Sequence, residues 1–394
     1  MLNVCHFANT IIGRPGNIGV RTERIIKALS EKGIRGYCLS RISERRSTGF
    51  VYRDMGWLGH IPRILKAVKI YLLPEFNFRY PAIKLFEWFA LRHLPETLIH
   101  FPGVAHVWDA CPNLIRSLKS AGYPVVLDIP IAPGEYAIRI SAQYGLDFLK
   151  VHQSSLNFHR ESYHLADIIL APSQFVAEEL VAVGVTQDKI RVVEFGVDVV
   201  SSTGNSSVVK QKLETLDFVF VGSVSRRKGV DLLLNAWGDA RFKDDRLHLC
   251  GRVFPEINPY LKHGDNGSIV TPGFIKPFDY LPKCDVFVFP SWLEGSAKAV
   301  YEAMACSLPV IVTRSSGSIV RDGVDGFVID AGDTNALRER MLWFKDNPQQ
   351  IKGMGTAAAE RVRDFTWERY ADRVIGVYRE LVAKSSTPNS CSDL

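Results

Sequence analysis

Apolar strand patterns alternate with helical patterns twice along this chain, and this alternation constrains the fold more than any other feature. Such an order is typical of α/β proteins, in which covering helices join parallel strands. It predicts two Rossmann-like units that face each other across a cleft. The strand patterns are LNVCHFA, GYCLSR, AHVW, YPVVLDIP and ADIILAPS in the first half, and LDFVFVGSVS, RLHLCGR, SIVTPGF, CDVFVFPS, LPVIVT and GFVID in the second.

The expected domain limits follow from composition. A chain of 394 residues is too long for one compact core, and the segment KIRVVEFGVD closes a first domain at residue 198. The small uncharged residues SSTGNSS then indicate a linker, followed by a second domain over 199–364 and a disordered polar tail over 387–394. Residues 365–386 show a helical apolar stripe that must be buried, made of Phe365, Trp367, Tyr370, Val374, Val377, Tyr378 and Leu381.

Two glutamates in the run PSWLEGSAKAVYEAMACSLPVIVT mark a candidate ligand site. Glu294 follows a strand pattern and lies in the loop before a helix, whereas Glu302 lies on that helix. Ligands of open α/β sheets bind at the carboxyl ends of the strands, and a helix start offers free N–H groups to an anion. We therefore expect a phosphate at Gly295, Ser296 and Ala297, with one carboxylate near each end of the ligand.

This run resembles the Glu-x7-Glu motif of retaining glycosyltransferases of family 4, also described as glycosyltransferases group 1. The resemblance implies the GT-B fold, with the terminal helix crossing back onto the first domain. It also implies that Glu294 faces the donor sugar near the reacting carbon and that Glu302 accepts hydrogen bonds from the ribose. Ala297 stands where the family has its second glycine, so the donor geometry can differ.

A second matching run, FVFVGSVSRRKGVDLLLNAW, is similar to the family's glycine loop at the start of the nucleotide domain. Gly222 and Lys228 match that loop, but Ser223 occupies the usual arginine position, so Arg226 or Arg227 is expected to supply the missing charge. Cations directed at a leaving diphosphate favour the transition state. We assign Lys228 and Arg227 to the diphosphate and name Glu294 and Lys228 as the catalytic residues.

The first domain gives weaker signals. Gly16 matches the family's glycine loop after the first strand, although Asn17 stands where a second glycine is usual. Asp128 ends a strand where many relatives have a sugar-contacting histidine, so it is a candidate for orienting the acceptor. His106 and Asp109 flank another strand end and are further acceptor candidates. The alternative is a glycine turn that serves only the strand-to-helix geometry of this loop.

Composition excludes several other classes. No segment has the roughly 18 uninterrupted apolar residues of a membrane span, and the first residues lack a signal-peptide pattern. The seven cysteines are scattered, which indicates reduced thiols in the cytoplasm. There is no grouping of metal ligands and no nucleic-acid recognition motif, so we expect no metal, no cofactor and no nucleic-acid partner.

Basic and aromatic residues interleave in an insertion over about 41–95. This composition suits peripheral contact with an anionic membrane at its inner face, or else an ordinary helical insertion whose charges face water. The residues are Arg45, Arg46, Arg53, Arg63, Lys66, Lys69, Arg79, Lys84 and Arg92, with Trp57, Tyr71, Phe76, Phe78, Tyr80, Phe86, Trp88 and Phe89.

The resemblance therefore predicts a retaining, metal-independent transferase that moves a sugar from a nucleoside diphosphate to a saccharide or lipid-linked acceptor, in cell-surface polysaccharide synthesis. Two alternatives remain open. A nucleotide-sugar epimerase on the same scaffold would need no acceptor. A non-catalytic nucleotide-sugar-binding module would account for the departures at Ser223 and Asn17.

Overall fold

A computed structural model describes residues 2–12, 17–61, 79–100, 103–198, 215–264 and 267–386 of the chain. Within these residues the backbone forms two separate parallel sheets, as the alternating pattern predicts. Gly16, the expected linker and the polar tail lie outside the described residues, as do Arg63, Lys66 and Lys69 of the insertion.

The first sheet of the described chain has seven strands in the order β3-β2-β1-β4-β5-β6-β7. Its central strands are buried on both faces because helices cover each side, which explains their continuous apolar sequences. The strands are β1 (Asn3–Ile12), β2 (Arg35–Ser43), β3 (Phe50–Asp54), β4 (Val104–Trp108), β5 (Val125–Asp128), β6 (Ile168–Ala171) and β7 (Ile190–Val192). The helices are α1 (Asn17–Glu31), α3 (Arg79–His100), α4 (Pro112–Ser120), α5 (Gly134–Tyr144), α6 (Gln153–Leu165) and α7 (Gln174–Ala182), with 3-10 turns η1 (Gly56–His60) and η2 (Gln187–Lys189).

The second sheet of the described chain has six strands in the order β10-β9-β8-β11-β12-β13. They are β8 (Asp217–Val221), β9 (Arg246–Cys250), β10 (Ile269–Gly273), β11 (Val286–Phe289), β12 (Val310–Thr313) and β13 (Gly326–Ile329). The helices are α8 (Val230–Trp237), α9 (Asn258–Gly264), α10 (Pro277–Tyr280), α11 (Lys298–Ala305), α12 (Thr334–Asp346) and α13 (Gln349–Val362). Short 3-10 turns η3 (Arg226–Lys228), η4 (Ala240–Phe242), η5 (Pro255–Ile257), η6 (Leu281–Lys283) and η7 (Arg314–Ser316) complete the domain.

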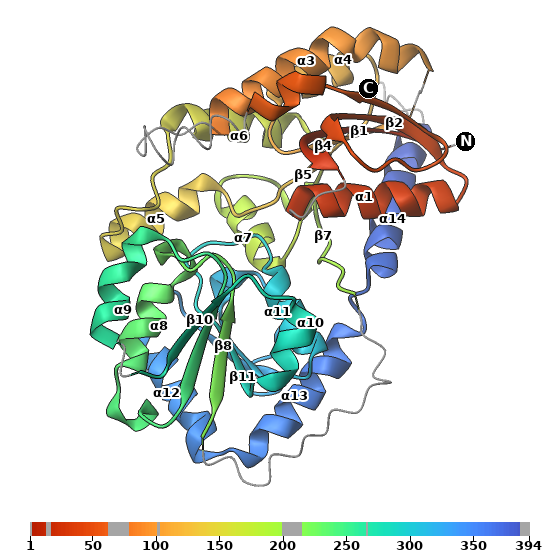
Figure 1. Cartoon of the computed structure of the whole chain (residues 1–394). Coiled ribbons are helices and arrows are strands. Elements are labelled where there is room, and N and C mark those ends of the chain that lie inside the picture. Colours follow the sequence, from red (N-terminus) through yellow and green to blue (C-terminus); the bar gives the residue numbers. More distant parts are fainter. Residues whose placement is uncertain are drawn as a thin grey trace, which may run out of the picture.

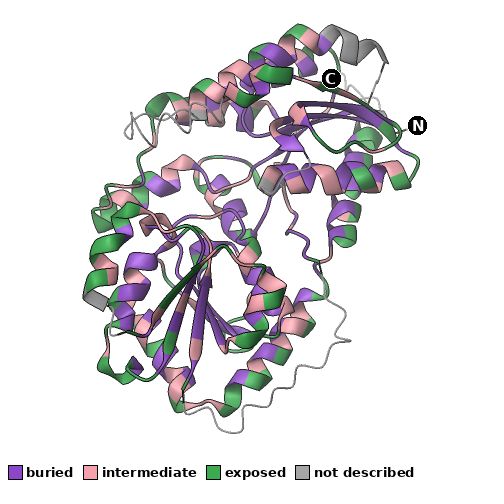
Figure 2. Ribbon diagram, viewed as in Figure 1, coloured by how far each residue is buried: buried purple, intermediate pink, exposed green. Residues whose placement is uncertain are grey.

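The two domains lie one above the other in Figure 1, and their buried residues gather around the two sheets in Figure 2. The carboxyl ends of both sheets meet at the boundary. Ser173, just after β6, donates its hydroxyl hydrogen to the carbonyl of Gly295, which lies in the loop after β11. Trp292 and Leu293 of that same loop pack into the apolar core of the first domain. Strand-end loops of both domains therefore form the boundary, where ligands of α/β folds bind.

The terminal helix α14 (Trp367–Ser386) crosses back to the first domain and packs beside α1 and β4 (Figure 1). Its residues Tyr370, Val374, Tyr378 and Leu381 are buried in a core with β1 and α1. This confirms the predicted crossing of the helix. Phe365 differs from the rest of the stripe, because it is buried in the core of the second domain.

The chain passes between the domains twice, and the two passages run side by side. Val197 pairs with Thr366 in a parallel bridge, and the N–H of Val197 donates to the carbonyl of Phe365 at 2.9 Å. A side chain at Gly196 would place its Cβ 2.5 Å from the Cα of Trp367, so glycine permits this close approach. The paired segments form one connection between the domains in place of two independent linkers.

Part of the 41–95 insertion is strand. Residues 50–54 form the edge strand β3, which pairs in parallel with β2 and extends the first sheet. Helix α3 then buries Phe86 and Ala90 against the first domain, while Trp88 points outward. Residues 62–78 of the insertion lie outside the described residues.

Candidate active site

Charged side chains from two neighbouring strand ends converge at the boundary of the domains. Strands β8 and β11 pair directly in the second sheet. Lys228 ends the 3-10 turn that follows β8, and Glu294 lies in the loop that follows β11. The Lys228 Nζ is 2.5 Å from Glu294 Oε1, and Arg227 Nη1 is 2.8 Å from the same oxygen. The structure thus brings together three residues that the sequence assigned to one donor site.

Burial strengthens this charge cluster. The Lys228 and Glu294 side chains are only 13% and 12% exposed. Burial lowers the pKa of the Lys228 ammonium, although the Glu294 carboxylate opposes that shift. Burial alone would raise the pKa of Glu294, but Lys228 and Arg227 outweigh it and hold that pKa below its ordinary value. Two cations share one carboxylate, so the cluster keeps a net positive charge suited to an anionic ligand.

Ser291 is a member of the cluster that the sequence analysis did not identify. Its hydroxyl donates to Glu294 Oε1 at 3.0 Å, and its carbonyl accepts from the hydroxyls of Thr313 and Ser315. These bonds join the ends of β11 and β12 beneath Glu294. The sequence does place this serine three residues before the glutamate in PSWLEG. Short hydroxyl side chains commonly form hydrogen bonds within such turns.

Of the two candidate arginines, Arg227 contacts Glu294 and Arg226 does not. Arg227 also donates to the carbonyl of Leu293 at 2.6 Å, which holds it over the Glu294 loop. Arg226 turns away, because it pairs with Asp147 at 2.8 Å and with Asp231 at 3.4 Å. Its guanidinium also lies 4.5 Å from the ring centre of Phe148. Arg226 therefore bridges the domains and is not part of the Glu294 cluster.

Gly222 lies at the end of β8 beside Gly251 at the end of β9. Both glycines have positive φ, and a Cβ on Gly251 would lie 1.9 Å from the carbonyl oxygen of Gly222. Only glycine fits this backbone-to-backbone packing. Ser223, which follows, is exposed. The turn thus presents backbone, with no bulky side chain, at the strand ends beside Lys228.

The second glutamate of the motif lies one turn into α11. Glu302 is buried, and its Oε1 accepts from Lys298 Nζ at 2.6 Å. Lys298 is half exposed, so this pair can open toward a ligand at modest cost. Ser296 donates its hydroxyl hydrogen to the Tyr301 hydroxyl at 3.1 Å and therefore points along the same helix.

One expected phosphate contact needs correction. The N–H of Ala297 donates to the carbonyl of Ser316 at 3.0 Å, so this donor is already used within the domain. Gly295 packs tightly against the first domain, where a Cβ would lie 2.2 Å from the carbonyl oxygen of Pro130. The loop therefore serves the domain boundary as well as any ligand.

The acceptor candidates Asp128 and His106 also need correction. Both are fully buried, and Arg21 Nη2 lies 2.6 Å from Asp128 Oδ2. His106 Nδ1 lies 2.5 Å from the Tyr378 hydroxyl, while Arg21 Nε donates to the Tyr370 hydroxyl at 2.9 Å. These residues join the sheet to α14 in the interior of the first domain, where an acceptor sugar has no access in this structure.

Asp109 lies just beyond, at the end of β4. Its backbone has φ of +78°, an uncommon conformation for a residue other than glycine. Its Oδ1 accepts from the N–H of Ala110 and lies 3.5 Å from His159 Nε2. The Asp109 side chain therefore bonds within the turn between β4 and α4, and its role at an acceptor stays a prediction.

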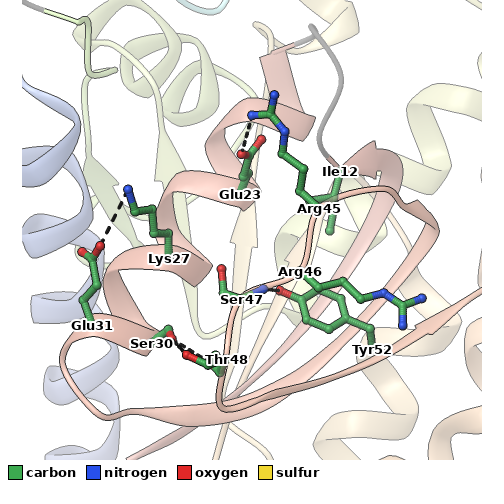
Figure 3. Close-up of a pocket in the computed structure, with 10 residues that line it drawn as sticks. All are labelled: Ile12, Glu23, Lys27, Ser30, Glu31, Arg45, Arg46, Ser47, Thr48 and Tyr52. Atoms are coloured by element: carbon green, nitrogen blue, oxygen red, sulfur yellow. Dashed lines mark hydrogen bonds and ion pairs between the residues drawn. The ribbon is translucent and has the colours of Figure 1, made fainter.

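Other features of the described chain do not add a second chemical site. No group of three potential metal ligands is present among the described residues. Across the same residues, no helix has the length and apolarity needed to cross a membrane. A pocket between α1 and the β2–β3 connection, of about 520 Å³, is lined by paired surface charges such as Arg45 with Glu23 (Figure 3).

Comparisons with known proteins agree with this geometry. A model described as Glycosyltransferase Family 4 matches residues 18–200, and one described as Glycosyl transferases group 1 matches residues 215–347. The two matched ranges correspond to the two domains. The chain therefore belongs to the family 4 glycosyltransferases, a family of transferase enzymes.

Individual curated relatives match only part of the chain. The chain is 34% identical over 169 residues to an uncharacterized glycosyltransferase, MJ1178, of Methanocaldococcus jannaschii, a match covering 41% of this chain and 48% of that protein. The chain spans about half the length of this relative and of other curated relatives that it matches.

Solved structures share the two-domain fold. Sucrose-phosphate synthase from Thermosynechococcus elongatus superposes with a TM-score of 0.72 at 18% identity, covering 98% of this chain and 100% of that one. Anabaena Alr3699/HepE in complex with UDP superposes with a TM-score of 0.65 at 15% identity, covering 96% and 100%. At these identities the likeness establishes the GT-B fold.

Proposed function

We propose that this protein transfers a sugar from a UDP-sugar to a hydroxyl group of a saccharide or lipid-linked acceptor, with retention of anomeric configuration and without a metal. The observation that carries the proposal is the buried cluster in which Lys228 and Arg227 share the carboxylate of Glu294. Two positive groups and one negative group leave room for one more anion. The choice of UDP is supported by its presence in the structure of HepE, which has the same fold.

Donor binding exchanges one anion for another at this cluster. The diphosphate takes over Lys228 and Arg227 as partners, which releases Glu294 toward the sugar. The exchange keeps both cations compensated at every stage, while the Ser291 hydroxyl remains a hydrogen-bond donor to the Glu294 carboxylate. Gly222 presents backbone at the neighbouring strand end, and Glu302 leaves Lys298 to accept hydrogen bonds from the ribose.

The chemical step is a displacement at the anomeric carbon. The bond from this carbon to the diphosphate oxygen breaks, and its electron pair stays with the leaving diphosphate. The acceptor oxygen forms the new bond on the same face, and its proton passes to the departing phosphate oxygen. Lys228 and Arg227 stabilise the charge that develops on the diphosphate, an interaction that strengthens in the transition state. Glu294 positions the sugar.

The acceptor side includes a proposed contact with an anionic membrane. Trp57 in η1 is 76% exposed and Trp88 on α3 is 54% exposed, both within the 41–95 insertion. Exposed tryptophans suit the headgroup region of a bilayer. Cosedimentation with anionic and with neutral vesicles tests this part, and a Trp57→Ala/Trp88→Ala double variant should bind anionic vesicles less. Equal recovery of wild type and variant with anionic vesicles would rule the contact out.

The function itself is tested by incubating the purified protein with UDP-glucose, UDP-galactose and UDP-N-acetylglucosamine in EDTA, with and without a cell-envelope extract. Release of UDP that rises with the extract supports transfer. Conversion of one UDP-sugar into its epimer, detected by NMR, would instead establish an epimerase. UDP binding with neither release nor conversion would point to a non-catalytic module.

A further inference from the structure

The geometry points to Ser173 as a positioning residue that couples closure of the two domains to the placement of Glu294. Ser173 follows β6 in the first domain, and Gly295 directly follows Glu294 in the second. The Ser173 hydroxyl donates to the Gly295 carbonyl at 2.6 Å, across 122 residues of sequence. The catalytic part of this inference rests on the proposed function, whereas the structural coupling does not.

Ser173 makes two different bonds with one oxygen. It accepts from the N–H of Val176 at 3.3 Å and thereby caps the first turn of α7. Its single hydroxyl hydrogen is free for the Gly295 carbonyl because capping uses a lone pair. The side chain is 3% exposed, so water competes little for either bond. The start of α7 is thus rigidly connected to the Glu294 loop.

A glycine in the second domain leaves the space for this bond. Gly317 has φ of +62°, and a Cβ there would lie 2.1 Å from the Gly295 oxygen and 2.7 Å from the Ser173 oxygen. Any side chain at this position would displace one of the two partners. The Cβ position of Gly295 is also closed, by the backbone of Pro130 and Ile131 in the first domain. Two glycines of the second domain, Gly295 and Gly317, are therefore required for this contact.

The Glu294 loop is held from both domains at once. Within the second domain, Glu294 N–H donates to Ser315 O at 3.1 Å. From the first domain, the N–H of Ala132 donates to the Glu294 carbonyl at 3.3 Å. Separation of the domains would break the Ala132 and Ser173 bonds. The Glu294 loop would then keep only its contacts within the second domain. Glu294 is consequently fully positioned only when the domains are together.

Hydrogen–deuterium exchange of the intact protein tests the coupling without substrate. In Ser173→Ala, we expect the Ala132 and Glu294 amides to exchange about fivefold faster, the factor for one lost hydrogen bond of ordinary strength. Ser173→Thr keeps the hydroxyl and should restore most of the protection. The control is Asp333→Ala, which removes the side-chain N-cap of α12. Asp333 Oδ1 accepts from the N–H of Ala336 at 2.8 Å, as the Ser173 hydroxyl accepts from the N–H of Val176 in α7.

The outcomes separate positioning from simple capping. If Ser173→Ala speeds exchange only in the first turn of α7, as Asp333→Ala should do in α12, Ser173 is a cap and the coupling is wrong. Where transfer from UDP-glucose is detected, Ser173→Ala should lower kcat about tenfold, with a smaller change in KM for the donor, because closure contributes to the reacting geometry. Wild-type inactivity would count against the proposed function and leave the exchange result to judge the coupling.

Discussion

Lys228 Nζ and Glu294 Oε1 lie 2.5 Å apart, and they come from the ends of two strands that pair directly, β8 and β11. In this structure each is the partner of the other. Because both side chains are largely buried, removal of either one leaves a charge with less compensation. We therefore propose that the Glu294 carboxylate occupies Lys228 until the diphosphate of a donor binds there. Variants of Glu294 and Lys228 should then affect donor affinity and turnover differently.

Glu294→Gln should bind UDP more tightly than the wild type while turning over more slowly. The substitution frees Lys228 and Arg227 from their anionic partner, so the diphosphate no longer competes with a carboxylate. We expect affinity to rise about tenfold, the factor for roughly 1.4 kcal/mol. Calorimetric titration with UDP checks the first part, and weaker binding would show that Glu294 itself contacts the nucleotide.

Lys228→Ala should lower turnover at saturating donor by about a hundredfold, the range for loss of one group that stabilises transition-state charge. KM for the donor should change less than kcat, because the interaction strengthens as charge develops. Steady-state kinetics in EDTA gives both parameters. The control is Lys27→Ala, on the exposed face of α1, where the side chain pairs with Glu31 on the surface and its removal should leave turnover unchanged.

Glu302→Ala should weaken UDP binding by about 1.5–3 kcal/mol, because it removes a charged acceptor from the ribose hydroxyls. Lys298→Ala provides the matched control, since it removes the present partner of Glu302 and leaves the carboxylate in place. Calorimetry should therefore give reduced affinity for Glu302→Ala and unreduced affinity for Lys298→Ala. The ribose assignment fails if the two variants bind UDP equally well.

Stability should decrease as the pH falls below about 6.5, the ordinary histidine value. Burial lowers the pKa of His6 well below that value, aided by neighbouring His106, and burial also lowers the pKa of His106. Well above pH 6.5 both histidines are neutral in the folded and the unfolded chain and contribute no slope. Below it the unfolded chain takes up protons first, at up to about 1.4 kcal/mol per pH unit for each group.

Urea denaturation at pH 7.5, 6.5 and 5.5 measures this slope. His6→Asn, which removes one of the two groups, should show a smaller loss of unfolding free energy between pH 6.5 and 5.5 than the wild type. An identical slope in the two proteins would show that His6 is protonated in the folded state.

Truncation before Trp367 should destabilise the first domain more than the second. The cut removes α14, whose Tyr370 and Tyr378 are the partners of buried Arg21 and His106. It spares Phe365, which belongs to the core of the second domain. Hydrogen exchange should show faster exchange in β1 and β4, and unchanged protection there would contradict the tie between α14 and the first domain.

The architecture could be predicted from the sequence because few folds are compatible with continuous apolar strands that alternate with helices. The resemblance also assigned Glu294 and Lys228 to one donor site, and the structure places these two side chains in contact. The resemblance did not anticipate the burial of Asp128, which stands where many relatives have a sugar-contacting histidine. This burial involves α14, whose Tyr370 meets Arg21 across 349 residues and helps to enclose the Asp128 site. Such a distant contact leaves no local pattern.

The dual use of the Glu294 loop was equally hidden. In the sequence, Gly295 and Ala297 indicate a phosphate loop, yet Gly295 also receives the Ser173 bond and Ala297 donates to Ser316. Each contact joins segments from different strand ends, so only the assembled sheets reveal it. Ser291 was overlooked although it lies only three residues before Glu294 in the same loop.

The most direct measurement of the central claim is calorimetric titration of UDP and of uridine into the wild type and Lys228→Ala, in EDTA. If Lys228 binds the diphosphate, the substitution should weaken UDP binding at least about tenfold, or 1.4 kcal/mol, and leave uridine binding unchanged. Equal UDP affinity in the two proteins would contradict the assignment of this cluster as the diphosphate site.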